Sequence, residues 1–219
     1  MSIIRAVILT KSNMFGNFCV AGIDVSTGQW VRFVANQKGD PLTREHLRLQ
    51  DGGECEPLDV VDVDVSRHVP ARHHTENYLI RPRLPWVKIA QWRMGDVLDL
   101  HPVETHRFLY GDFRPYLEEP FLSKLNFNYS LILIQVRNLA IEYERNAQGE
   151  VKPKASFSYN RESYRWIRVT DPFYAPDEEG DAGEGIAIGD AYLVVSLPQD
   201  SYHGKYYKLI AKIFPIDPF

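Results

Sequence analysis

The sequence predicts a mostly β chain that folds as two small barrels in tandem, joined by a short helical connection. Short apolar or alternating runs recur along it, each bounded by turn residues, and this pattern is typical of small antiparallel barrels. One order of motifs also occurs twice, once in each half. Aromatic residues make up 12% of the chain, which again favours strands.

The repeated order has three parts. An apolar strand comes first, followed by a hairpin whose return strand reads Trp, β-branched residue, Arg. After a gap comes a strand that begins with Asp and has valines near its centre. The parts are residues 3–9, 30–34 and 59–66 in the first half, and 131–136, 166–170 and 190–196 in the second. We interpret them as a degenerate duplication and predict a first barrel over residues 1–100, a helical connector over 101–128 and a second barrel over 129–219.

In the first half, residues 3–9 are apolar enough for a buried strand. The strands at residues 19–23 and 30–34 flank a polar turn that contains Gly28, which predicts a hairpin. The alternating run "LDVVDVDVSRHV" predicts the next strand after a long polar stretch. Two segments, "PWVKIAQWRMGDVLDL" and "PVETHRFLYGDF", are expected to form short helices, the second beginning at Pro102.

In the second half, "SLILIQVRNLAIEYE" predicts a long strand, and "NAQGEVKPK" predicts the turn after it. The segment "ASFSYNRESYRWIRVTDP" contains two short strands around "NRES". The segments "DAYLVVSLP" and "KYYKLIAKIFP" predict the last strands. An acidic, glycine-rich loop, "PDEEGDAGEG", lies before them and is expected to be mobile.

Composition narrows the function classes. A net charge of −4 argues against a protein that coats duplex DNA through bulk positive charge, although a local basic groove is compatible with it. The two cysteines, Cys19 and Cys55, form no CxxC pair for zinc or redox chemistry. No apolar run is long enough for a signal peptide or a membrane span, so we expect a cytoplasmic protein with no membrane partner.

Several motifs together resemble a known family. They are "FCVAGIDVSTGQWVRFV", "EPLDVVDVDV", "ENYLI", "ASFSYNRESYRWIRVTDP" and "YYKLIAKI", and they resemble the bacterial dual OB-fold domain family over nearly the whole chain. The resemblance implies two tandem oligonucleotide/oligosaccharide-binding (OB) barrels that bind nucleic acid or nucleotides, in the setting of prokaryotic defence. It supplies no catalytic residues. The loop before "IGDAYLVVS" is longer and more acidic here than expected of that family.

The return strands suggest a binding surface. Side chains alternate across a strand, so Trp30 and Arg32 share one face while Val31 and Phe33 share the other and should fill the barrel. In the second half, the same alternation places four residues on one face: Tyr164, Trp166, Arg168 and Thr170. An outward aromatic ring beside an outward arginine suits base stacking and phosphate binding. The candidate ligand-binding residues are Trp30, Arg32, Tyr164, Trp166, Arg168, Thr170, Asp171 and Lys208.

Each candidate also has a structural interpretation. Arg32 could cover Trp30 through a cation–π contact, or the two faces could pack against other parts of the chain. Asp171 could cap its own turn, which is the commoner role for an Asp before Pro. Lys208 could lie on a solvated strand edge.

The function that we predict is non-enzymatic binding of single-stranded nucleic acid or a nucleotide-like ligand, with no cofactor. Under this hypothesis, Arg32→Ala weakens binding and leaves the fold intact. One alternative is an adaptor that binds a protein partner, because Trp, Tyr and Arg also enrich protein interfaces. The other is a metal-dependent nuclease that uses Asp62, Asp64 and His68, although no metal-binding motif supports it.

Overall fold

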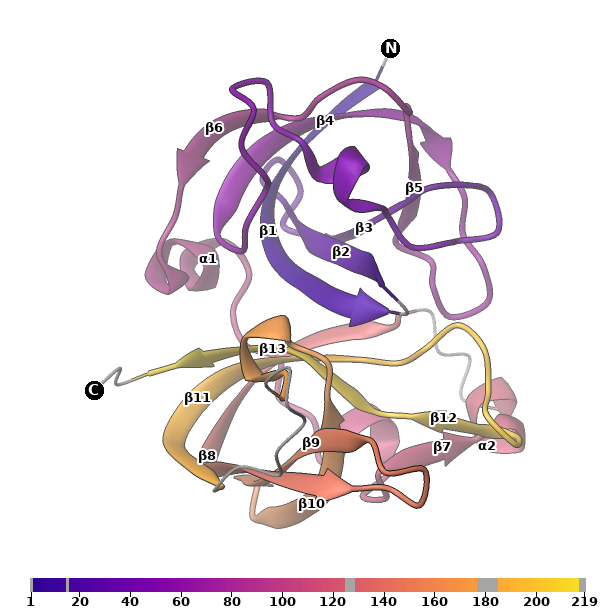
Figure 1. Cartoon of the computed structure of the whole chain (residues 1–219), viewed down its shortest axis with the longest axis vertical. Coiled ribbons are helices and arrows are strands. Elements are labelled where there is room, and N and C mark those ends of the chain that lie inside the picture. The colour runs from indigo at the N-terminus through magenta and orange to yellow at the C-terminus, as the bar shows by residue number, and fades with distance from the viewer. Residues whose placement is uncertain (1, 15, 125–128, 177–184, 217–219) are drawn as a thin grey trace. The chain divides into compact units, whose positions relative to one another are not determined.

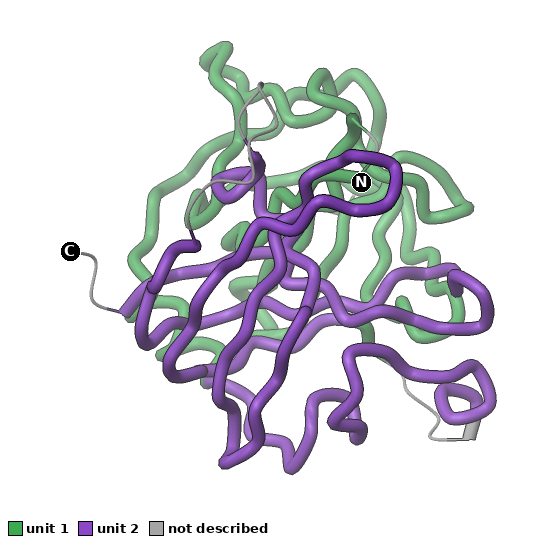
Figure 2. Tube along the Cα trace, turned by 60° about the horizontal axis from the view of Figure 1, so that its bottom comes forward, with its two compact units in different colours: residues 1–102, 128–130 green, residues 103–127, 131–219 purple. Residues whose placement is uncertain are grey.

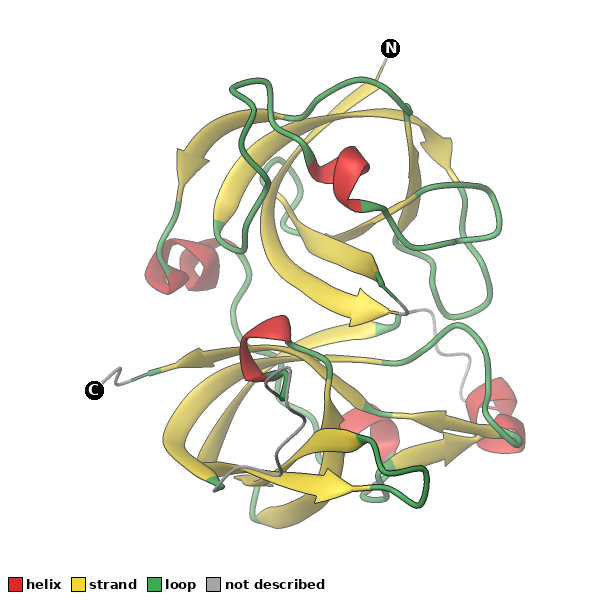
Figure 3. Ribbon diagram, in the orientation of Figure 1, coloured by secondary structure: helices red, strands yellow, loops and turns green. Residues whose placement is uncertain are grey.

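The computed structural model describes residues 2–14, 16–124, 129–176 and 185–216. The chain forms two compact units, residues 1–102 with 128–130 and residues 103–127 with 131–219 (Figure 2). Strands dominate both units (Figure 3). Within the described residues, no helix has the length and the apolar character needed to cross a membrane.

The first unit is a five-stranded barrel. Its strands pair in the order β1-β2-β3-β5-β4, and pairing between β1 and β4 closes the ring. Strands β3 and β5 are parallel, while the other neighbours are antiparallel. The strands are β1 (Ser2–Met14), β2 (Asn17–Asp24), β3 (Trp30–Val34), β4 (Asp59–His68) and β5 (Asn77–Ile80), with β6 (Val87–Gln91) added to β4, and the unit also contains η1 (Arg44–Leu47) and α1 (Met94–Leu100).

The second unit repeats this topology. Its closed ring runs β8-β9-β10-β13-β11, and β10 and β13 are its parallel pair. The ring strands are β8 (Leu131–Arg145), β9 (Val151–Tyr159), β10 (Glu162–Val169), β11 (Ile186–Ser196) and β13 (Leu209–Pro215) (Figure 1). Numbered within each unit, both rings have the strand order 1-2-3-5-4, which is the order of the OB barrel. The predicted fold class of two tandem OB-like barrels is therefore confirmed.

Several shorter elements accompany the second ring. They are η2 (Leu109–Gly111), β7 (Tyr116–Glu118), α2 (Glu119–Lys124), η3 (Pro172–Tyr174) and β12 (Lys205–Tyr207). Strands β7 and β12 pair as an antiparallel two-stranded ribbon. Most of the connector predicted over residues 101–128 clusters with the second ring, and β7 within it pairs with β12.

Alternation along the strands builds both cores. In β9 every second residue is buried, from Val151 to Tyr159, and the residues between them are partly exposed. In the first barrel Val31 and Phe33 are 2% and 1% exposed, as parity predicts, and the Phe33 ring lies 5.2 Å from that of buried Trp86. These side chains exclude water from the barrel interior, which is the main favourable term in folding.

Three local expectations are wrong. The segment 85–100 was expected to be one helix, but Val87–Gln91 pairs with β4 and only Met94–Leu100 is helical. Within 102–113 there is only the short turn of η2, where Tyr110 has a left-handed φ of 53°. The predicted turn at 146–154 is shorter, because Val151 already pairs with Arg145. The acidic residues 177–184 lie outside the described part of the chain.

Candidate nucleic-acid interface

The arginine of the first return strand is buried. Arg32 is 8% exposed, so the expectation that it points into solvent is wrong. Its Nε lies 3.3 Å from Oε1 of Glu76, and its Nη2 donates a 2.8 Å hydrogen bond to Oγ of Ser130, which belongs to the same compact unit. The Ser130 hydroxyl in turn donates to Glu76. Arg32 thus neutralises a buried carboxylate.

The outer face of β2 and β3 is closed around this arginine. Opposite Arg32 on β2 lies Ala21, and opposite Trp30 lies Ile23, and both β2 residues are buried. Trp30 itself is half-buried, with its ring edge-on to His101 at 5.5 Å. The first barrel therefore offers no open aromatic and basic platform on these two strands.

The equivalent strand of the second barrel is open. Trp166 is 54% exposed, and Arg165 and Arg168 on either side of it are exposed too. Trp166 and Arg168 thus point outward as parity predicts, and they occupy the strand position that Trp30 and Arg32 occupy in the first barrel. The same short motif is closed in one barrel and open in the other.

A β-bulge sets the direction of Trp166. Tyr164 pairs with Phe157 and Ile167 pairs with Ala155, so Arg165 and Trp166 together oppose the single residue between those partners. Trp166 has a φ of 64°, in the left-handed region that glycine adopts without strain. A bulky residue there carries backbone strain of order 1–2 kcal/mol. Such strain persists where the surrounding structure imposes it, and it is concentrated at functional sites.

One lysine of β9 lies beside the exposed ring. Nζ of Lys154 lies 5.2 Å from the centroid of Trp166, and Lys154 is also the register partner of Arg168. Carboxylates temper this charge: Lys154 pairs with Glu144, and Lys152 lies 3.2 Å from Glu150. Arg165 and Arg168 form no ion pair within the described residues, although Glu150 interacts with Arg168 at longer range, so the face keeps two arginines next to an exposed indole.

Tyr164 does not belong to this face, because the bulge turns it inward. It is 2% exposed, and its ring stacks on Phe157 at 5.4 Å. Its hydroxyl oxygen accepts a 3.0 Å hydrogen bond from the backbone N–H of Leu109, and burial raises its pKa to about 12. Parity had grouped Tyr164 with Trp166, and the extra residue of the bulge overturns that grouping.

Asp171 and Thr170 hold the end of β10. Asp171 is 2% exposed and accepts hydrogen bonds from the backbone N–H groups of Phe173 and Ile213 and from Nζ of Lys212. It therefore caps η3, the structural role named above. The Thr170 hydroxyl donates to the carbonyl of Ile210. Both side chains fix the chain beside β13.

Lys208 is an interior residue. Parity places it on one face with Ile210, and that face is the core: the two residues are 1% and 0% exposed. Its Nζ donates to the carbonyl oxygens of Asp112 and Arg114 at 2.5 and 2.6 Å and lies 5.6 Å from the Tyr164 ring. Burial lowers its pKa to about 7. The expectation of a solvent-facing Lys208 is wrong.

Asp62 and His68, two residues of the nuclease alternative, each contact a different part of the first unit. Asp62 accepts two hydrogen bonds from Arg5, at 2.7 and 2.8 Å, and this pairing lowers the pKa of its carboxyl. His68 lies against the carbonyl of Thr75. In the part of the chain that the structure describes, no group of three His, Cys, Asp or Glu residues is placed to hold a metal ion.

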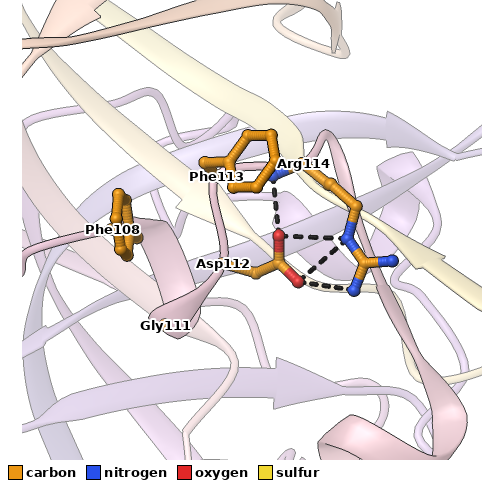
Figure 4. A pocket seen from close by; sticks show the side chains of 5 residues that line it. All are labelled: Phe108, Gly111, Asp112, Phe113 and Arg114. Carbon is orange, nitrogen blue, oxygen red and sulfur yellow. Dashed lines mark hydrogen bonds and ion pairs between the residues drawn. The ribbon is translucent and has the colours of Figure 1, made fainter.

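A pocket of about 470 Å³ lies beside η2, lined by Phe108, Gly111, Asp112, Phe113 and Arg114 (Figure 4). The two charged residues of the pocket pair with each other: Asp112 accepts hydrogen bonds from the backbone N–H and from the guanidinium of Arg114. Burial opposes ionisation of Asp112, but the bonds from Arg114 hold its pKa below the ordinary value. Two phenylalanine rings remain as the main contact surface, and Phe113 is 65% exposed.

These features define a class: a chain of two OB barrels, one of which carries an exposed aromatic and basic patch on its second and third strands. The family model of the dual OB-containing domain matches residues 4–213, and the chain belongs to this family. The resemblance drawn from the sequence motifs is thereby confirmed. Comparison with curated proteins and with solved structures gave no match.

Sequence reasoning missed the two lysines of the open face. Lys152 and Lys154 lie in a segment expected to be a turn, although the alternation of "VKPKASFSY" carries the strand signal that could have identified them. Arg165 is exposed next to exposed Trp166, although strict alternation would place two adjacent side chains on opposite faces. The bulge brings Arg165 to the outer face beside Trp166, and no residue type in the sequence predicts that bulge.

Proposed function

We propose that this protein binds single-stranded nucleic acid on the outer face of β9 and β10 in the second barrel. The exposed ring of Trp166 is the observation that carries the proposal. It is 54% exposed, lies at a bulge, and is bordered by Lys154 and by two exposed arginines, Arg165 and Arg168. OB barrels commonly bind oligonucleotides on their second and third strands, which here are β9 and β10.

Stacking rather than bulk charge would supply most of the affinity. The chain has a net charge of −4, so general attraction to a polyanion is weak. A base stacked on an aromatic side chain contributes roughly 1–3 kcal/mol regardless of its identity. Lys154, Arg165 and Arg168 would place the phosphates, while Trp166 would hold a base.

Replacing Trp166 by glycine is expected to weaken binding of an oligonucleotide by about 5- to 150-fold, the loss of one stacked base. Glycine is chosen because it adopts a φ of 64° without strain, so the melting temperature should stay level or rise. Fluorescence anisotropy of a labelled single strand measures the affinity, and circular dichroism measures the stability.

Phe113→Ala is the matched control, because Phe113 is also an exposed aromatic of the second unit but lies at the pocket beside η2. Its affinity should equal that of the wild type. Equal affinity of the Trp166→Gly variant and the wild type would remove the β9–β10 face from the site. A wild type that binds no oligonucleotide but copurifies with one protein partner would favour the adaptor alternative.

The salt dependence of binding should be shallow. Each phosphate contact to a single strand contributes about −0.7 to the slope of log K against log salt, so three cations give a slope near −2. Arg168→Ala should reduce that slope by about 0.7 and leave the fold unchanged, since Arg168 is exposed. Titrations at four salt concentrations measure it, and an unaltered slope would exclude Arg168 as a phosphate ligand.

A role in prokaryotic defence and a cytoplasmic location stay predictions from the resemblance and from composition. The choice between DNA and RNA also belongs to the experiment, in which both labelled strands are titrated side by side.

A further inference from the structure

The two-stranded ribbon β7–β12 carries a second group of aromatic and basic side chains. Tyr116 and Tyr207 are register partners, and their ring centroids are 5.6 Å apart. Two cations lie near the Tyr116 ring. Nζ of Lys205 is 4.4 Å from its centroid, and the Arg114 guanidinium carbon is 5.4 Å from the same centroid. Tyr207 is 38% exposed. The ribbon thus repeats the combination of ring and cation found at Trp166.

The ribbon and the Trp166 face belong to one outer surface of the second barrel. Strand β12 runs through Lys208 into β13, and Tyr206, Lys208 and Ile210 all point into the core. The alternate residues Lys205, Tyr207 and Leu209 therefore point outward. Leu209 is the register partner of Arg168, so Tyr207 lies on the same face as Arg168.

Hydrogen bonds also place β7 and β10 along one edge of the continuous strand β12–β13. The N–H of Lys208 donates to the carbonyl of Pro115, just before β7, at 2.9 Å. The carbonyl of Ile210 accepts from the N–H of Thr170, just after β10, at 2.8 Å. Backbone groups two residues apart point to the same edge of a strand, so β7 follows β10 along that edge.

Two cations of the ribbon region, Arg114 and Lys205, lie near two carboxylates, Asp112 and Glu118. Arg114 is neutralised by Asp112 and Glu118, at 2.6 and 2.9 Å. Lys205 forms no ion pair in the described part of the chain, and its ammonium group lies over a ring. Glu118 is the register partner of Lys205 and tempers its charge. The group of Tyr207, Tyr116 and Lys205, which we call the ribbon site, therefore offers two aromatic rings beside one lysine, a combination like that of the Trp166 face.

We infer that the ribbon site is a second base-stacking position, so that one single strand of nucleic acid runs from the Trp166 face across Arg168 and Leu209 to Tyr207. This inference rests on the proposed function and extends it to the path and the minimum length of the ligand. A very short oligonucleotide occupies the Trp166 face alone. A longer one stacks at both positions and binds more tightly.

The test compares labelled oligothymidylates of four and twelve nucleotides on the full chain. Tyr207→Ala should lower the affinity for the twelve-nucleotide strand by about fivefold or more and leave the four-nucleotide affinity unchanged. Trp166→Gly should weaken binding of both lengths. Lys205→Gln should reduce the salt slope for the longer strand only, by about 0.7.

Each outcome separates the two proposals. Equal affinities of Tyr207→Ala and wild type for twelve nucleotides, with Trp166→Gly still defective, overturn the ribbon site and leave the proposed function standing. An equal loss for both lengths also overturns it, because Tyr207 would then act on the Trp166 face or on the fold. If the wild type binds neither length, the proposed function fails as well.

Discussion

Arg32→Ala is expected to destabilise the first barrel by about 3–5 kcal/mol, because it leaves the Glu76 carboxylate buried without its partner cation. The sequence had suggested the opposite outcome, weaker ligand binding with an intact fold. Ser130 loses a hydrogen-bond donor in the same substitution. Urea denaturation followed by tryptophan fluorescence measures the effect, since Trp86 is 1% exposed in the core of this barrel and reports its unfolding.

Arg168→Ala is the matched control at the equivalent position of the second barrel. Arg168 is exposed and forms no ion pair within the described residues, so its removal should change the free energy of unfolding by no more than about 0.5 kcal/mol. The double variant Arg32→Met/Glu76→Met should recover most of the lost stability, because it removes both charges together. Comparable stabilities for Arg32→Ala and Arg168→Ala would contradict the buried ion pair.

Lys208 should make the stability of the second barrel rise between about pH 7 and pH 9. Burial lowers its pKa from 10.5 to about 7, so over this range the unfolded chain holds a proton that the folded chain has released. The unfolded state binds more protons, and the free energy of unfolding therefore increases with pH. A full proton over two pH units would correspond to about 2.7 kcal/mol, and roughly 2 kcal/mol is expected because the folded chain is still half protonated at pH 7.

The chemistry around Lys208 fits a neutral amine. Its two N–H groups match the two carbonyl acceptors, Asp112 and Arg114, and the Tyr164 ring lies over the nitrogen. Above about pH 10 the trend should reverse, because burial raises the pKa of Tyr164 and of Tyr174 in the same unit to about 12, and these groups resist ionisation in the folded state.

The measurement is urea denaturation at pH 6, 7, 8 and 9, compared between the wild type and Lys208→Met. The variant should have lower stability at pH 9 and a flatter profile, and the difference between the two slopes is the readout. A titration of the Lys208 side chain by NMR provides the second measurement, with a midpoint near pH 7 expected. Parallel profiles, or a midpoint near 10.5, would contradict the assignment.

Local pattern was enough to predict the architecture. Alternation in "WVRFV" placed Val31 and Phe33 in the core, and the repeated order of motifs predicted two barrels of one topology. These features depend on residues near each other in sequence and on the two-residue period of a strand. The same period could not reveal the bulge at Trp166, because one extra residue exchanges the faces of everything before it.

Whether a polar candidate residue is buried or exposed depends on partners that are distant in the sequence. Arg32 is neutralised by Glu76, 44 residues away, and bonded by Ser130, 98 residues away. Lys208 meets its carbonyl acceptors 96 and 94 residues earlier in the chain. A short motif describes its own strand but does not contain the groups that cover it, which is why one Trp-x-Arg pattern became a buried ion pair and the other an open face.

Because Trp166 has a left-handed backbone conformation, the residue that is best for stability at position 166 differs from the residue that is best for ligand binding. A glycine there would score as neutral or improved in any selection for thermal stability or expression. The same change would score as a loss in a selection for ligand binding. Deep mutational scanning of position 166 under both selections would therefore yield opposite rankings for glycine and tryptophan, and that inversion would mark the residue as one maintained for its ligand rather than for its fold.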